Sequence, residues 1–255
     1  MSTEQPACHE HSEMTGPIET SVQCGYHRRG RPGALNDLLR VAGELMIPAV
    51  HAASVEFSIA SDRAATYSYT SGTAKTDTYE TTIVQEWARC MSSHAAFAEY
   101  GVVWEAKFRT GVRGRPPAVD IVLEDEVSSA SKKVALIEVK VSEAELDETA
   151  LWGDAKKLWE LQVGASQSGH VDVRAKRLVV NVVRGLEAGT TPKDFEASVK
   201  ALVDKSSSWE PRFGAVFSAV FPVFRPSSAE PGGPRSAMWE VCGLAGFELR
   251  AGAYS

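Results

Sequence analysis

The amino-acid sequence predicts an α/β (α+β) fold in which helices flank a central mixed β-sheet. Short apolar runs rich in Val and Ile, at 118–125, 134–141 and 177–185, are typical of buried strands. Longer stretches with a helical apolar period lie between and around them. The resulting order of helix, three strands, helix, strand and helix favours a mixed sheet with helices on its faces.

Composition is that of an ordinary globular chain. The 255 residues are 44% hydrophobic and 24% charged, which suits one large domain with an appendage. Runs such as "VALI" and "LVVNVV" are far shorter than the ~20 apolar residues of a membrane helix, so we expect no membrane partner. The polar start "MSTEQPACHEHSEMTG" lacks the features of a signal peptide. Four scattered cysteines do not suggest a disulfide framework, and we expect a cytoplasmic protein.

The first third of the chain is predicted as an arm followed by a helix and a hairpin. Residues 1–33 show no apolar period and are interpreted as a flexible N-terminal arm, and residues 34–255 as a single domain. An amphipathic helix is expected over 34–48, where Pro48 helps to stop it. The alternating stretches 54–61 and 66–73 suggest a β-hairpin.

The middle of the chain combines two long helices with three strands. The first helix is expected over 77–101, with Asp77 as its cap and Gly101 as its end. Strands are expected at 102–110, 118–125 and 134–141, and a second long helix at 143–165. Farther along, the sequence predicts these elements: a strand at 177–185, a helix at 191–206, and strands at 213–224 and 237–249.

The strand "VALIEVKV" contains two charged residues that need an explanation. Glu138 and Lys140 share one face of the strand because side chains alternate. They could be a solvent-facing pair on a half-exposed sheet. If the strand pairs with 118–125, however, Asp120 comes close to Glu138, and two adjacent carboxylates repel unless a cation lies between them. Mg²⁺ suits two carboxylates, waters and a phosphate oxygen.

The first long helix places another acid on its apolar stripe. At 100° per residue the stripe is formed by Tyr79, Ile83, Trp87, Cys90 and Met91. Glu80 lies in the middle of this stripe, whereas Glu86 lies at or beyond its edge. Glu80 is therefore the preferred fourth member of the site, although the helix dipole also favours a glutamate in a first turn.

These residues resemble the PD-(D/E)XK nuclease superfamily, the fold of many restriction endonucleases. The pattern here is Asp120, seventeen intervening residues and then Glu138-Val139-Lys140, after a helix with a glutamate on its apolar face. The resemblance covers roughly residues 76–184.

Two further details bear on the resemblance. The stretch "GDAKKLWEL" at 153–161 is similar to a helix that commonly follows the Glu-x-Lys strand in this superfamily, with an acid followed by Lys-Leu. Val119 departs from the pattern, because the family motif has a proline before the aspartate. The resemblance implies a restriction endonuclease-like arrangement of the sheet.

The resemblance also implies roles for the site residues. Asp120 and Glu138 would be ligands of Mg²⁺, for which Mn²⁺ could substitute, and Val139 a further ligand. Lys140 would assist the attacking water, and Glu80 would be an accessory acid that binds a second metal or a metal-bound water. The implied reaction is hydrolysis of a phosphodiester bond.

Basic residues near these motifs are candidates for contact with DNA. "RGRP" occurs at 29–32 and 113–116 and is similar to the core of an AT-hook, although so short a string also arises by chance. The candidates for phosphate contact are Arg29, Arg31, Arg113, Arg115, Lys156 and Lys157. On an exposed helix, such lysines often contact water alone.

Two other features have weaker support. Gln162 is a polar residue in phase with the apolar face of the second long helix; it would hydrogen-bond near the site or satisfy a backbone group. Four residues have spacings that could chelate zinc: Cys8, His11, Cys24 and His27. Their polar surroundings, without an apolar core, favour an arm without Zn²⁺.

The sequence thus predicts a Mg²⁺-dependent endonuclease acting on double-stranded DNA. A restriction endonuclease working as a homodimer is the leading interpretation, because cutting both strands favours two-fold symmetry. The alternatives are a structure- or end-specific nuclease of repair, recombination or mobile elements, and a non-catalytic DNA-binding module of the same fold. A zinc-dependent regulator acting through the arm is a third.

Overall fold

The computed structural model describes residues 35–66, 75–108, 118–125, 132–164, 171–226 and 237–251. The expected N-terminal arm, with its zinc-like spacing and the first "RGRP", lies outside the described residues. So does the second "RGRP", with Arg113 and Arg115.

The described residues form four α-helices, two short 3₁₀ helices and six strands. The helical elements are α1 (Leu35–Thr66), α2 (Lys75–Ser93), η1 (Ala95–Phe97), α3 (Glu148–Gly164), α4 (Pro192–Lys205) and η3 (Ser206–Ser208). The strands are β1 (Tyr100–Lys107), β2 (Ala118–Asp125), β3 (Lys132–Glu143), β4 (Val171–Arg184), β5 (Arg212–Pro226) and β6 (Ala237–Arg250). The strands expected from the sequence after residue 101, and the two helices expected between them, are present, but the helix expected over 143–165 begins later, at Glu148, because β3 continues to Glu143.

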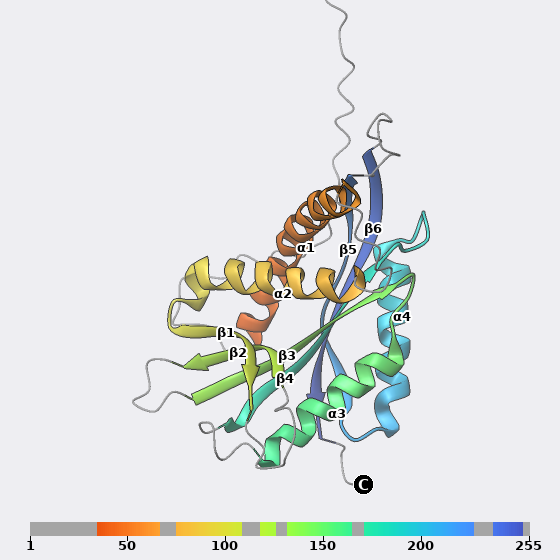
Figure 1. Ribbon diagram of the computed structural model, residues 1–255. Coiled ribbons are helices and arrows are strands. Elements are labelled where there is room, and N and C mark those ends of the chain that lie inside the picture. Colours follow the sequence, from red (N-terminus) through yellow and green to blue (C-terminus); the bar gives the residue numbers. More distant parts are fainter. Residues whose placement is uncertain are drawn as a thin grey trace, which may run out of the picture.

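The strands form one mixed sheet with the order β1-β2-β3-β4-β6-β5 (Figure 1). Only β3 and β4 are parallel neighbours, and α3 connects them; every other neighbouring pair in the described sheet is antiparallel. A parallel pair requires such a crossover, because the chain must return to the same end of the sheet before the second strand begins.

Helices cover both faces of the sheet, as the sequence predicts. In Figure 1, α1 and α2 lie above the sheet and α3 crosses below it. Alternate residues of β3 and β4 supply the two cores. Ile137 and Val180 pack in the cluster under α1 and α2, whereas Leu136 and Val179 pack in the cluster under α3 and α4.

The helix expected over 34–48 does not end at Pro48, and the strand expected at 54–61 is wrong as well. Helix α1 continues through Pro48 to Thr66. The ring of Pro48 is exposed, while Met46, Val50 and Ala53 are buried, so the apolar period continues unbroken on the inner face. Burial of that face outweighs the hydrogen bond that proline removes. The second half of the expected hairpin, from residue 67 on, lies outside the described residues.

Helix α1 contains a stretch, Asp37–Val55, that is long and apolar enough to cross a membrane. Half of this stretch is buried inside the protein. The same composition is found in helices that pack in a protein core, and the buried residues of α1 contribute to the cluster shared with α2.

The bounds of the helix expected over 77–101 also require correction. Helix α2 begins at Lys75, so Asp77 lies inside it and is not its cap, and it ends at Ser93. His94 then caps η1 by accepting a hydrogen bond from the Ala96 N–H at 3.2 Å. Gly101, the expected end of the helix, lies in β1 opposite Glu124.

Phe217 of β5 packs against both α1 and β6. A β-bulge between Ala215 and Phe217 interrupts the pairing of β5 with β6. The ring of Phe217 lies so close to two glycines that a Cβ added at Gly43 would be 2.7 Å from it, and one at Gly246 would be 2.3 Å from it. Close approach of the backbone to an aromatic ring therefore requires glycine at both positions.

We expect Gly246→Ala to lower the free energy of unfolding by about 1–3 kcal/mol, because the added methyl group overpacks the core against Phe217. Gly153→Ala, in α3, is the matched control: nothing lies within 4 Å of the added Cβ, and alanine favours helix by about 1 kcal/mol. Urea denaturation of both variants measures the difference. Equal stabilities would contradict the packing described for Phe217.

Candidate active site

The candidate site forms where β2 and β3 separate. Their regular pairing in this direction ends at Ile121 and Ile137, while β3 remains paired with β4 as far as Glu143. In a strand the N–H groups of alternate residues point to the same edge, so Val139 and Val141 face the gap that β2 leaves.

Two carboxylates take the place of the missing strand. Oδ2 of Asp120 accepts a hydrogen bond from the Val139 N–H at 2.7 Å. Oε2 of Glu80, from α2, accepts one from the Val141 N–H at 3.1 Å. Buried backbone donors without an acceptor are costly, so the two acids stabilise the open edge of β3.

Asp120 and Glu138 lie side by side, as the sequence predicts. Continuing the register of Ile121 and Ile137 places them directly opposite one another on one face. Burial raises the pKa of Asp120, although the Val139 N–H and Lys157 work against the shift. A hydrogen bond between the two carboxyl groups also contributes.

Glu138 is the most perturbed acid of the site. Its side chain is 4% exposed. Burial, and next the charge of Asp120, raise the pKa of Glu138 to about 9 against the opposing effect of Lys157. Oε1 is a fully buried atom without a well-aligned hydrogen bond, although Nζ of Lys157 lies 2.7 Å away. A buried oxygen in this state is suited to bind a cation.

Lys140 and Glu80 form the second charged pair. Nζ of Lys140 lies 3.1 Å from Oε2 of Glu80 and 3.5 Å from Oε1. Burial works to lower the pKa of Lys140, but Glu80 and the neighbouring aspartates outweigh it and raise the pKa above its usual range. Lys140 is therefore an ammonium group at neutral pH and donates hydrogen bonds.

Helix α3 adds two residues, Asp154 and Lys157. Burial raises the pKa of Asp154 to about 6, in spite of the attraction of Lys157 and Lys140. Asp154 is the acid of the "GDAKKLWEL" stretch, but its place beside the other acids depends on how α3 packs and does not follow from spacing alone.

Asn181 fixes the start of α3 relative to β3. This fully buried residue of β4 donates a hydrogen bond from Nδ2 to the Lys140 carbonyl at 2.9 Å. Its Oδ1 accepts hydrogen bonds from the Ser142 hydroxyl at 3.2 Å and the Asp147 N–H at 3.3 Å. Asp147 immediately precedes α3 and accepts a hydrogen bond from the Ala150 N–H, so Asn181 links the strand of Lys140 to the helix of Asp154. In the sequence, the sign of this role is that Asn181 is the single polar residue inside "LVVNVV".

The remaining predicted residues have different positions. Lys156 points away from the site, with Nζ 3.8 Å from Glu160 on the exposed side of α3. Gln162 lies in α3, but its side chain is outside the part that the structure describes. Glu86, the less favoured glutamate of α2, pairs with Arg89 at 2.9 Å.

The residues present fit a divalent cation held partly by substrate and water. Among the described residues, no three Asp, Glu, His or Cys side chains converge to enclose a metal ion by themselves. Mg²⁺ is usually bound by one or two carboxylates together with waters and phosphate oxygens. Asp120 and Glu138 provide two such carboxylates, and the carbonyl of Val139 faces the same gap as its N–H.

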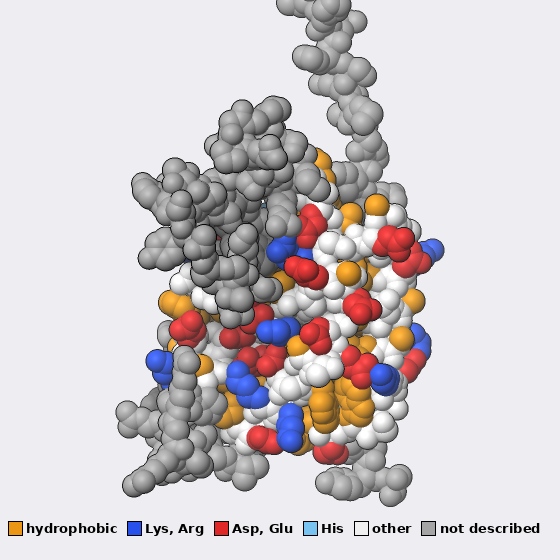
Figure 2. Space-filling view, turned by 45° about the vertical axis from the view of Figure 1, so that its right-hand side comes forward, with side chains coloured by type: hydrophobic (Ala, Val, Ile, Leu, Met, Phe, Trp, Pro, Cys, Tyr) orange, Lys and Arg blue, Asp and Glu red, His pale blue; other side chains and the backbone are white. Residues whose placement is uncertain are grey.

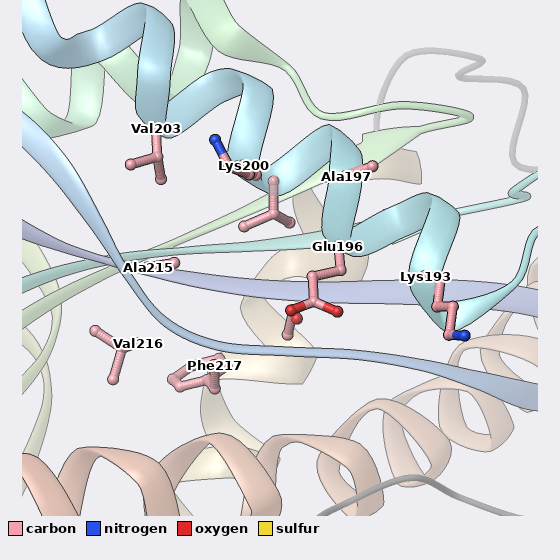
Figure 3. A pocket seen from close by; sticks show the side chains of 10 residues that line it. Lys193, Glu196, Ala197, Lys200, Val203, Ala215, Val216 and Phe217 are labelled. Atoms are coloured by element: carbon pink, nitrogen blue, oxygen red, sulfur yellow. The ribbon is translucent and has the colours of Figure 1, made fainter.

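The described surface offers other concave regions. Acidic and basic side chains are interspersed across the face seen in Figure 2. A pocket of about 570 Å³ lies between α4 and β5, and in Figure 3 Glu196 of α4 extends toward the strand of Val216 and Phe217. None of the four acids of the candidate site lines this pocket.

Comparisons with known proteins identify no relative. No protein-family model, curated protein or solved structure matches the chain. The functional argument therefore depends on the geometry of these side chains.

We expect Asp120→Ala to be less stable than Asp120→Asn by about 1–2 kcal/mol. The asparagine side-chain oxygen can still accept the hydrogen bond of the Val139 N–H, whereas alanine leaves this donor without its acceptor. Thermal and urea denaturation of both variants measures the difference. Equal stabilities would show that Asp120 does not support the open edge of β3.

Stability in the presence of EDTA should fall between about pH 5 and pH 9. The pKa of Glu138 is about 9 in the folded protein and 4.5 in a free side chain, so the folded state binds more protons throughout this range. We expect Glu138→Gln to remove up to about 1.4 kcal/mol per pH unit from the slope of unfolding free energy against pH. Glu196→Gln, on the exposed side of α4, is the control and should retain the wild-type slope. An unchanged slope in Glu138→Gln would refute the assignment.

Proposed function

We propose that the protein is a Mg²⁺-dependent endonuclease of the restriction type that hydrolyses phosphodiester bonds of double-stranded DNA. The observation that carries this proposal is the convergence of Asp120, Glu138 and Lys140 on one side of the gap between β2 and β3. The arrangement agrees with the PD-(D/E)XK pattern of the sequence, including the helical Glu80, which reaches the same gap.

Asp120 and Glu138 would hold the cation, with the Val139 carbonyl beside them. When bound, Mg²⁺ supplies a Lewis acid that polarises the phosphate and stabilises the departing oxygen. The backbone hydrogen bond from Val139 fixes one oxygen of Asp120, which leaves the other oxygen free to turn toward the cation. Burial fixes the carboxyl group of Glu138. Both ligands are therefore positioned before substrate binds.

Lys140 would orient the attacking water and stabilise negative charge on the phosphate. Its raised pKa keeps it protonated at neutral pH, so it acts as a hydrogen-bond donor and not as the base. Glu80 holds the Lys140 ammonium in place at 3.1 Å and can accept a hydrogen bond from a water in the gap. Preorganised donors of this kind stabilise developing charge without reorganisation.

A non-catalytic DNA-binding module remains the alternative that one observation favours. Two acids of the site already have a lysine partner within the described part of the protein: Glu80 pairs with Lys140, and Glu138 with Lys157. Such a module would bind DNA without cutting it. A structure- or end-specific nuclease would use the same chemistry and differ only in its choice of DNA.

We expect the purified protein to cut supercoiled plasmid DNA with Mg²⁺ and not with EDTA. Lys140→Ala should lower the cleavage rate at least ~100-fold, because it removes a preorganised donor. Lys200→Ala, which removes an exposed charge on α4, is the control and should retain wild-type cleavage.

The products distinguish the alternatives. Discrete bands indicate a site-specific endonuclease, and a smear or nicked circles indicate a nuclease that selects structure or ends. DNA binding without cleavage at any Mg²⁺ concentration would refute the enzyme proposal and favour the module. Full cleavage by Lys140→Ala would refute the role of Lys140.

A further inference from the structure

Lys157 lies close to three acids of the site, Glu138, Asp120 and Asp154. Its Nζ lies 2.7 Å from the buried Oε1 of Glu138. Asp120 and Asp154 are also close enough to feel its charge. The adjacent Lys156 faces solvent, so the helical phase of α3 selects one lysine of the pair for the site.

An ammonium group in this place conflicts with a divalent cation on the same oxygen. Mg²⁺ lies 2.0–2.1 Å from its oxygen ligands, and two cations that approach one carboxylate oxygen so closely repel each other strongly. Glu138 has little freedom to avoid the conflict, because its side chain is 4% exposed and belongs to a central strand.

Lys157 has the freedom that Glu138 lacks. Its side chain is 34% exposed, and its backbone belongs to helix α3, outside the sheet. A lysine has a flexible four-carbon stem and three rotatable donors, so it can leave one oxygen and reach another at little cost. Once displaced from Glu138, the ammonium group can bind an anionic group of the substrate instead.

We propose that Lys157 is an internal competitor of the divalent cation: it holds Glu138 when no cation is bound and contacts a DNA phosphate once a cation displaces it. The inference rests on the proposed function. It gives Lys157 two successive partners, the buried Oε1 of Glu138 in the metal-free site and a phosphate oxygen once substrate and cation are bound.

Two effects of opposite sign follow from this exchange. Removing the ammonium eliminates the competitor, so the cation should bind more tightly. Removing it also eliminates a phosphate contact, so cleavage should weaken. A lysine with a purely structural role would lower both properties together.

The first measurement is Mn²⁺ binding without DNA, followed by the electron paramagnetic resonance signal of free Mn²⁺. Lys157→Met should bind Mn²⁺ about tenfold more tightly than wild type, which corresponds to about 1.4 kcal/mol. Lys156→Met makes the same change in net charge outside the site and should stay within twofold of wild type. Lys157→Gln provides a second neutral variant that can still hydrogen-bond to Glu138 and should also bind more tightly.

The second measurement is plasmid cleavage at saturating Mg²⁺. Lys157→Met should raise KM for DNA severalfold, in spite of its tighter cation binding. Unchanged or weaker Mn²⁺ binding in both Lys157 variants, with wild type binding Mn²⁺, would overturn the competitor role and leave the proposed cation site intact. Absence of Mn²⁺ binding in wild type and in both variants would refute the cation site and the competitor role together. Binding by the variants alone would support the competitor role most strongly.

Discussion

The candidate site depends on one structural constraint, the early separation of β2 from β3. Where β2 departs, the edge of β3 retains two N–H groups, those of Val139 and Val141, that no longer have a strand partner. Val139 and Val141 are buried, so their N–H groups need acceptors, which here come from side chains. Asp120 and Glu80 supply them from two different elements, and this requirement draws both carboxylates to the same short segment of β3 as Glu138 and Lys140.

The same constraint produces a concentration of charge. Four acids and two lysines meet at a place where burial disfavours ionisation, and the acids with the largest shifts, Glu138 and Asp154, are strongly affected by it. Such clusters reduce stability unless charges of opposite sign are close. Perturbed acids at one point of a sheet are also typical of functional sites, because catalysis needs charge that is already in place when substrate arrives.

Much of this arrangement could be predicted from local pattern. The alternation in 118–125 and 134–141 determined which side chains share a face, and antiparallel pairing then placed Asp120 opposite Glu138. Helical phase distinguished Glu80 from Glu86 because the first lies on the stripe that turns toward the sheet. Regular elements make such inferences possible, because their periodicity fixes side-chain direction.

The errors arose where tertiary packing overrides local signals. Pro48 is a strong helix breaker in isolation, yet the buried face of α1 extends beyond it. Whether Lys156 or Lys157 turns inward, and whether Asp154 joins the acids, depends on how α3 docks on the sheet. Asn181 sets that docking through contacts with residues about forty positions earlier in the chain, which a local pattern does not reveal.

The position of β6 has a consequence for how the protein assembles. This strand follows β5 in the chain but lies between β4 and β5 in the sheet, so it is the only described strand that joins β5 to the rest. A nascent chain that has emerged only through β5 would therefore contain every residue of the acid cluster, while its outermost strand still lacked a partner. The sheet can be completed only when β6 inserts between β4 and β5, two strands that are synthesised before it.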